Sequence, residues 1–451
     1  MLNKGLSQIG LRLLDRATDA FPASVPKFFN RAFIGLLGSR PIAQMTLKKY
    51  RKRWDRIAEG LSPHSKILLI VDVCIGDTVL ASECLPVLQE AFPNSEVHFV
   101  CNRTGGELID GMLGIHVHNI FEGARGFPTN GDLVRLRSLL TNERFDAMFN
   151  LGPFLDPKAL PDGSPLIQLF VPFAAHMLIR WKSDEHRHIS YCARTFLREF
   201  LGVDAGPSHN VTLNTNTVYL SRESLELAHA FLDAQGLLDA KGLVLFNADA
   251  TSAYGQMPFD VQLSVLRHLC AMREISNVLI GKAYTAKGIE QKLLAELPEE
   301  FHAKIVIVPH VPIEVYTALI DASDMFISGD TGPLHIAACR KQGPKELPSM
   351  RNRTAVLAIY GATDSKMYGY DSEQAYHVPA NQDAPSRSFS APAPCRNISC
   401  INKFGKSCHE VRCFHELPLD GIFAHIDSFF QGRAEPPPVT IALTAKREYA
   451  I

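Results

Sequence analysis

The stretch from Met325 to Arg340, with the sequence MFISGDTGPLHIAACR, holds residue types that could bind an anion. The apolar run Met325–Ser328 predicts a buried strand, and a helix is predicted after the Gly- and Pro-containing turn that follows. Backbone N–H groups in such a turn, together with the positive end of the helix, attract a phosphate group. His335 is near enough to reach a ligand over the first helical turn. In the alternative interpretation, Asp330 or Thr331 simply caps the helix.

A second carboxylate has a comparable position early in the chain. Ile67–Val73 is a continuous apolar run, typical of a parallel strand that is covered on both faces. The turn Cys74–Gly76 follows this run, and Asp77 opens the next predicted helix. A carboxylate there could remove a proton from an attacking hydroxyl group. A role as an N-cap alone fits the composition around Asp77 equally well.

Two series of strand–helix units are predicted to position these residues. Each series alternates apolar runs with helical stretches, which indicates an α/β fold with a doubly wound parallel sheet. A linker rich in Gly, Pro, Asn and Thr, Gly202–Ser221, separates the two series. Open α/β sheets bind ligands at the carboxyl ends of their strands, so a cleft between the two units is the expected site. The predicted strands are Ile67–Val73, Glu96–Cys101, Ile115–Ile120, Phe145–Asn150, Leu243–Phe246, Val278–Ile280, Ile305–Val308, Met325–Ser328 and Ala355–Tyr360.

Composition narrows the classes of function. A chain of 451 residues exceeds what one core usually supports, so two domains are expected. The formal charge of −1 argues against nucleic-acid binding by the chain as a whole. Ten cysteines without a signal-like N-terminus predict a reducing, cytoplasmic setting. The sequence has no uninterrupted apolar run of the roughly 20 residues that a membrane-spanning helix needs.

Residues 1–60 form a basic arm that differs from the rest of the chain. Up to Arg56 the arm has five Lys and seven Arg against three Asp, a net charge of +9. Apolar residues are interleaved with these charges, and the basic run Lys48–Arg53 lies near its end. Such an amphipathic arm could lie on an anionic membrane surface, which predicts a peripheral contact at the inner membrane. Alternatively, its helices pack on the first domain and leave their charges in solvent.

Three motifs, in order, resemble those of the heptosyltransferase-like glycosyltransferases, glycosyltransferase family 9. Ile70–Pro86 resembles the first strand–turn–helix of that family, whose hallmark is a Gly-Asp pair before an apolar helix. Ser328–Ala338 resembles the donor-site loop Asp-[Ser/Thr]-Gly-x-x-His, and Tyr360–Asp364 resembles the Gly-x-Thr segment after the next strand. The resemblance extends from about Lys66 to Gln431 and leaves the basic arm outside.

The resemblance implies a GT-B fold, with two Rossmann-like domains that face each other across a cleft. Residues 61–220 would form the acceptor domain and residues 221–433 the nucleotide-sugar donor domain, with 434–451 as a loose tail. The implied reaction is inverting transfer of a sugar, commonly heptose from ADP-heptose, onto a glycan or glycolipid such as lipopolysaccharide core, without a required metal. Asp77 matches the family's general base, and the donor-loop positions are Asp330, Thr331, Gly332 and His335.

The sequence departs from the family in the donor domain. Family members usually carry a Lys-containing segment after the first donor-domain strand, whereas Asn247–Pro258 contains no lysine. Thr251 and Ser252 could keep a hydroxyl role there. Stabilisation of the leaving group would then come from Lys282 or from the basic insertion 340–353. The departures leave open another nucleotide-sugar donor, a protein acceptor, a nucleotide-sugar epimerase or a non-catalytic GT-B binding module.

A cysteine-rich segment, 395–413, has the spacing C-x4-C-x7-C-x4-C. Four thiolates could enclose a structural Zn or Fe ion, although both outer gaps are wide for such a site. Free thiols or a disulfide are the alternative. His186 and His188 also have a spacing that metals can use, but without a third ligand nearby the turn is interpreted as a solvated loop. The four cysteines of the segment 395–413 are Cys395, Cys400, Cys408 and Cys413.

Overall fold

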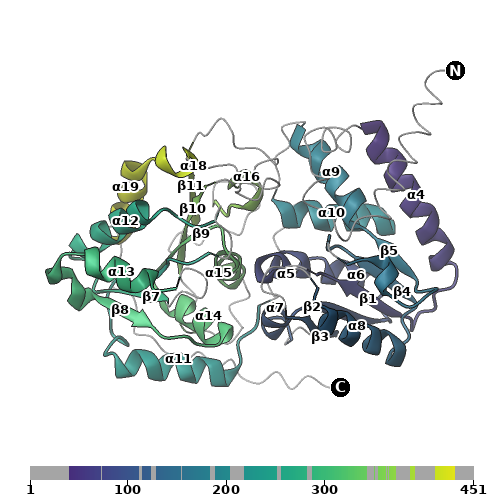
Figure 1. Cartoon of the computed structure of the whole chain (residues 1–451), viewed down its shortest axis with the longest axis horizontal. Helices are drawn as coiled ribbons and strands as arrows, with labels where there is room; N and C mark the ends of the chain where they lie inside the picture. Colours follow the sequence, from purple (N-terminus) through teal and green to yellow (C-terminus); the bar gives the residue numbers. More distant parts are fainter. Residues whose placement is uncertain are drawn as a thin grey trace.

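A computed structural model shows two α/β halves, each built on its own parallel sheet (Figure 1). Mixed α/β architecture with two parallel-sheet domains is therefore confirmed. The structure describes residues 40–72, 74–110, 114–122, 128–153, 155–182, 188–203, 218–250, 255–281, 287–342, 350, 354–361, 363, 365–371, 386–391 and 412–431.

The first sheet has five parallel strands in the order β3-β2-β1-β4-β5. The chain starts in the middle and moves outward in both directions, which creates a switch point at the carboxyl end of β1. Leu68 and Leu69, which point to opposite faces, are both fully buried, so helices cover the two faces of this sheet. The strands are β1 (Lys66–Ile70), β2 (Glu96–Asn102), β3 (Ile115–Phe121), β4 (Ala147–Asn150) and β5 (Leu166–Gln168).

Helices surround this sheet, and two of them matter for the site described below. Helix α5 starts just after β1, and α10 packs against it. The helices of the first half are α4 (Arg40–Ala58), α5 (Ile75–Ser82), α6 (Leu85–Ala91), α7 (Arg103–Glu107), α8 (Asn130–Asn142), η1 (Pro157–Ala159), α9 (Phe170–Lys182) and α10 (Ile189–Leu201).

The second sheet has six parallel strands in the order β11-β10-β9-β6-β7-β8. Its central strands β6 and β9 are buried along their whole length, as expected where helices cover both faces. The strands are β6 (Leu243–Asn247), β7 (Asn277–Gly281), β8 (Ile305–Val308), β9 (Met325–Gly329), β10 (Ala355–Tyr360) and β11 (Ser386–Ser390).

The helices of the second half follow the same alternation. Helix α15 comes directly after β9 and lies against α14 and β10. These helices are α11 (Arg222–Ala234), α12 (Phe259–Ala271), α13 (Ile289–Glu296), η2 (Glu299–Lys304), α14 (Ile313–Ala322), α15 (Gly332–Gln342), α16 (Ser365–Tyr368), α18 (Arg412–His415) and α19 (Leu419–Gln431).

All nine predicted strands are present in the structure, and the described part of the chain contains two more, β5 and β11, that were not predicted. β5 spans only three residues, too few for a periodic pattern to be recognised. β11 has the polar sequence SRSFS and sits at the edge of its sheet, where strands do not need to be apolar. Both strands that the apolar runs did not reveal therefore lie at the edge of a sheet.

Helix α4 uses its apolar face for packing on the first half. Trp54 is 5% exposed and packs against Phe92, Phe149 and Phe200, while the neighbouring Lys52 and Arg53 are exposed. This packing agrees with the interpretation that the end of the arm lies on the first domain. Among the residues that the structure describes, no helix combines the length and the apolarity that a bilayer crossing requires.

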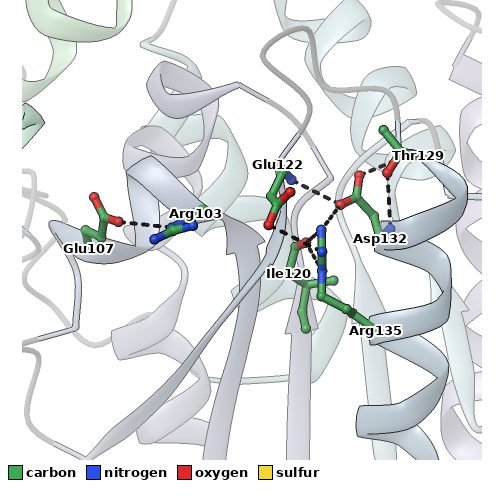
Figure 2. A network of polar contacts seen from close by, with 7 residues as sticks. All are labelled: Arg103, Glu107, Ile120, Glu122, Thr129, Asp132 and Arg135. Carbon is green, nitrogen blue, oxygen red and sulfur yellow. Dashed lines mark hydrogen bonds and ion pairs between the residues drawn. The ribbon is translucent and has the colours of Figure 1, made fainter.

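The N-terminus of α8 is tied to the end of β3 by a buried carboxylate, shown in Figure 2. Asp132 accepts hydrogen bonds from the backbone N–H groups of Thr129 and Glu122, at 2.7 and 3.2 Å, and pairs with Arg135. The Thr129 hydroxyl in turn accepts from the Asp132 N–H, which completes a capping box. Burial acts to raise the pKa of Asp132, but these hydrogen bonds outweigh it, and its pKa is lowered.

We expect Asp132→Ala to lower the free energy of unfolding by about 1–2 kcal/mol, because it removes the cap and leaves the partly buried N–H groups of Thr129 and Glu122 without their carboxylate acceptor. Chemical denaturation monitored by circular dichroism measures this change. Asp420→Ala is the matched control, since Asp420 is an exposed acidic residue in the first turn of α19. Equal stability of the two variants would contradict this role for Asp132.

Candidate functional site

The first part of the site is the start of α5, which follows the switch point at the end of β1. Cys74 is the N-cap residue of α5 and makes no side-chain capping bond, so Asp77 is the third residue of the helix. An N-cap role for Asp77 is therefore wrong. Asp77 keeps an exposed side chain in the first turn of α5, where the helix dipole favours a negative charge.

The second part is the loop between β9 and α15, which a polar network holds in place. The Asn247 amide donates hydrogen bonds to the Ser328 and Thr331 hydroxyls, at 3.0 and 3.2 Å, and these two hydroxyls lie 2.8 Å apart. Asn247 is the last residue of β6 and Ser328 is near the end of β9. Adjacent strands thus fix the loop at the carboxyl edge of the second sheet.

The N-termini of α5 and α15 are in contact across the two halves (Figure 1). A Cβ atom built on Gly76 would lie 2.9 Å from Cδ2 of His335 and 3.3 Å from Cα of Gly332. A Cβ atom built on Gly332 would overlap the Ile75 side chain. Both glycines are therefore required for this close approach.

An apolar cluster supports the contact behind the helix ends. Val79 of α5 and Leu108, next to α7, are buried together with Ile336 and Cys339 of α15. Val218, from the segment that leads into the second half, is buried in the same cluster. Residues from both halves thus form one small apolar core, which holds the N-termini of α5 and α15 against each other.

Three ionisable side chains meet at this junction. Desolvation by the surrounding protein raises the pKa of Asp77 to about 6; His335 opposes this shift and Asp330 adds to it. Although Asp77 as a whole residue is exposed, protein surrounds its carboxyl group closely enough to disfavour its charge. Nε2 of His335 lies 3.5 Å from Oδ1 of Asp330, and the Thr363 hydroxyl donates to the other Asp330 oxygen at 2.6 Å.

Aromatic side chains enclose the imidazole of His335. Its Nδ1 atom lies 2.8 Å from the Tyr370 hydroxyl, and both residues are buried. Burial raises the pKa of Tyr370 well above its ordinary value, so the phenol stays protonated and can donate to Nδ1. The ring of His188, from the first half, lies 4.8 Å from that of Tyr370. The site is therefore built by both halves of the chain.

The structure brings together the predicted residues Asp77, Asp330, Thr331, Gly332 and His335. The other predicted site residues fall outside the described residues, apart from Cys413, which is buried. They are Thr251, Ser252, Lys282, Cys395, Cys400 and Cys408.

Two interpretations of the sequence need correction. The basic insertion 340–353 is predicted to supply positive charge for a leaving group, but Arg340 at its start is 1% exposed and its guanidinium is 2.6 Å from the Asp321 carboxylate. It also donates to the Val218 carbonyl at 3.0 Å, so its charge serves the fold. The turn with His186 and His188 is predicted to be a solvated loop, yet His188 is buried and its Nδ1 accepts from the Ser190 N–H as the N-cap of α10.

Three residues of the site were missed in the sequence, namely Asn247, Thr363 and Tyr370. A signal existed for two of them, because Asn247 ends a predicted strand and Thr363 belongs to the Gly-x-Thr segment. Their contacts link segments that are 84 and 33 residues apart in the chain, which a local pattern does not show. Tyr370 lies beyond the motifs and carried no local signal.

Comparison with known proteins confirms the resemblance drawn from the motifs. Residues 214–399 match the family model for glycosyltransferase family 9 (heptosyltransferase). No curated protein sequence matches the chain.

Several solved structures are similar to the chain. A glycosyl transferase family 9 protein from Veillonella parvula has a TM-score of 0.58 at 15% identity over 83% of this chain and 99% of that one, which shows a shared fold. ADP-heptose lipopolysaccharide heptosyltransferase II of E. coli gives 0.48 at 14% identity over 80% of this chain and 99% of that chain. The iron-containing dodecameric glycosyltransferase TibC of enterotoxigenic E. coli gives 0.46 at 12% identity over 82% and 76%.

The raised pKa of Asp77 predicts a cost to stability. The folded chain holds the Asp77 proton more tightly than the unfolded chain does. Protonated Asp77 therefore contributes to stability at low pH, and this contribution is lost as the pH rises from about 4 through about 6. We therefore expect Asp77→Asn to unfold at a higher temperature than the wild type at pH 7.5, with the difference vanishing toward pH 4. Thermal unfolding at several pH values tests this. Asp260→Asn, an exposed first-turn residue of α12, should show no such pattern.

The contact between α5 and α15 predicts that Gly332→Ala is destabilising. The added methyl group overlaps Ile75, and relieving such overpacking typically costs about 1–3 kcal/mol. Chemical denaturation measures the loss, and small-angle scattering detects any separation of the two halves. Gly131→Ala in α8 is the control, because its nearest neighbour, Oγ1 of Thr129, would be 3.7 Å away. A Gly332→Ala variant as stable as Gly131→Ala would contradict the close approach.

Proposed function

We propose that the chain is an inverting glycosyltransferase that moves heptose from ADP-heptose onto a cell-envelope glycan such as lipopolysaccharide core. One observation carries the proposal: the carboxylate-bearing start of α5 contacts the N-terminus of α15, in a chain whose residues 214–399 match glycosyltransferase family 9. Glycosyl transfer needs a base for the attacking hydroxyl and an anion site for the departing diphosphate. Each half of the chain would supply one of these two groups.

In this proposal Asp77 is the general base. Its carboxylate takes the proton of the acceptor hydroxyl while the hydroxyl oxygen forms a bond to the anomeric carbon of the sugar. The bond from that carbon to the diphosphate oxygen breaks on the opposite side, so the configuration inverts and nucleoside diphosphate leaves. A pKa of about 6 suits this role, because near pH 7 Asp77 is mostly ionised yet more basic than an ordinary carboxylate.

The loop between β9 and α15 would hold the diphosphate. Ser328 and Asn247 already engage the Thr331 hydroxyl, so the backbone N–H groups of Thr331 and Gly332 are the donors we assign to the phosphate oxygens. The dipole of α15 adds a partial positive charge at the same place. Nε2 of His335 lies 3.5 Å from Asp330, so an N–H at this nitrogen would donate to the Asp330 carboxylate beside the bound diphosphate.

Other parts of the proposal rest on sequence alone. Donor contacts from Thr251, Ser252 and Lys282, catalysis without a required metal, and a structural Zn or Fe ion at the cysteine-rich segment all stay predictions. The same holds for a cytoplasmic location with peripheral membrane contact through the N-terminal arm.

Turnover of a nucleotide-sugar panel that includes ADP-heptose, with cell-envelope extract as acceptor, tests the proposal. We expect the wild type to release nucleoside diphosphate only when acceptor is present. Asp77→Asn should lose at least about 100-fold in turnover, since base catalysis contributes 10²–10⁴-fold, while still binding the nucleotide. Asp260→Asn should match the wild type. Nucleotide binding without turnover by the wild type would instead favour a non-catalytic binding module.

The pH profile of kcat/KM provides an independent prediction. We expect activity to fall on the acid side with a midpoint near pH 6, where Asp77 becomes protonated. His335→Ala should move this midpoint to higher pH, because His335 lowers the pKa of Asp77. His229→Ala, on α11, serves as the control. An acid limb that does not respond to His335→Ala would argue against Asp77 as the base.

A further inference from the structure

A group of potential metal ligands lies at the amino ends of the strands in the first sheet, at the end opposite to the candidate active site. Glu96 and His98 are two residues apart on β2, and His116 and His118 are two residues apart on β3. Residues at this spacing share one face of a strand, and the register pairs His98 with His116. The four side chains therefore gather on one face, near the amino ends of β2 and β3. The candidate active site is at the carboxyl ends of the strands, so the two sites are separate.

The ligand atoms of this cluster lie close enough together to approach a single metal ion. Nε2 of His98 lies 3.5 Å from Oε2 of Glu96. Ligand atoms at about 2.1 Å from a tetrahedral Zn²⁺ ion are roughly 3.4 Å apart. One ligand atom each from Glu96, His98 and His116 all lie within 4.8 Å of one another. Three ligand atoms could thus converge on one ion with small side-chain rotations.

His118 has a different place in the cluster. Its Nε2 atom lies 2.9 Å from Nδ1 of His98, and the two rings are nearly parallel, 5.2 Å apart. A metal on Nε2 of His98 requires the ring proton on Nδ1, where it would be donated to His118. Metal-binding histidines commonly make such a bond with their second nitrogen, which fixes the tautomer and the ring orientation. His118 is therefore a positioning residue for His98.

The neighbouring charges allow an ion to enter. Nζ of Lys66 lies 3.3 Å from Oε2 of Glu96 but closer, at 2.6 Å, to Oε2 of Glu143. An ion that takes the Glu96 carboxylate would leave Lys66 with its nearer partner. His98 is buried and packs edge-on against Phe145, so its ring has a fixed position, while Glu96 and His116 are exposed and give access from solvent.

We propose that Glu96, His98 and His116 bind a Zn²⁺ ion, with His118 orienting His98 and water as the fourth ligand. Two neutral imidazoles and one carboxylate are ligands that zinc accepts. The ion would link β2 to β3, the outermost strand of the sheet, so its binding would stabilise the pairing of these two strands.

Zinc titration of the full-length chain, with bound zinc counted after gel filtration, tests the proposal. The cysteine-rich segment could bind zinc as well, so the titration is repeated in a variant with Cys395, Cys400 and Cys408 changed to Ser. We expect one equivalent of zinc to remain in this cysteine variant. Adding Glu96→Gln or His116→Ala should remove it, and His118→Ala should weaken it. His229→Ala is the matched control and should bind as before.

Zinc should also raise the unfolding temperature of the cysteine variant and should not do so once His116→Ala is added. His116 is exposed, so that change should leave the metal-free fold intact, which far-UV circular dichroism verifies. Absence of bound zinc in the cysteine variant would overturn the proposal, and so would zinc binding that neither Glu96→Gln nor His116→Ala reduces.

Discussion

The contact between the N-termini of α5 and α15 is the constraint on which the rest of the site depends. Each helix end carries a partial positive charge, so two such ends in contact repel each other. The arrangement persists because Gly76 and Gly332 allow close packing, and an apolar cluster from both halves supports the contact behind the helix ends. Desolvation raises the pKa of Asp77 at this junction, and the Asp330 carboxylate adds to that shift. His335 opposes the shift, because it lowers the pKa of Asp77.

The surroundings of α15 hold this contact rigid. At its N-terminus, Asn247 and Ser328 fix the loop from two adjacent strands. Near its C-terminus, Arg340 is buried against Asp321 of α14 and the Val218 carbonyl. A buried ion pair is costly to form, but breaking it by removing one partner is costlier still, so it favours one orientation of the helix. The apolar cluster around Val79 and Ile336 then binds this oriented helix to the first half.

Parallel strands align their ends, so the carboxyl ends and the amino ends of the strands in the first sheet carry different groups of side chains. At the carboxyl end, β1 leads into α5 and the candidate active site. At the amino end, β2 and β3 place Glu96, His98, His116 and His118 together. The rings of His116 and His118 stack on the ring of His98, close to the Glu96 carboxylate. No loop motif in the sequence marks these histidines. A regular strand register is enough to gather them.

The sequence alone determined the repeated strand–helix order, because buried parallel strands require the long apolar runs seen at 67–73 and 325–328. It also pointed to Asp77 and the Asp330–His335 loop as candidate site residues, since turns after such strands have recognisable composition. It did not reveal β11, an edge strand without an apolar pattern, or the role of Tyr370. The burial of Arg340 and His188 was decided only by tertiary structure, because both depend on partners more than 15 residues away or in the other half. The contact between Gly76 and Gly332 has the same origin: 256 residues separate them, and only the docking of the two halves brings them together.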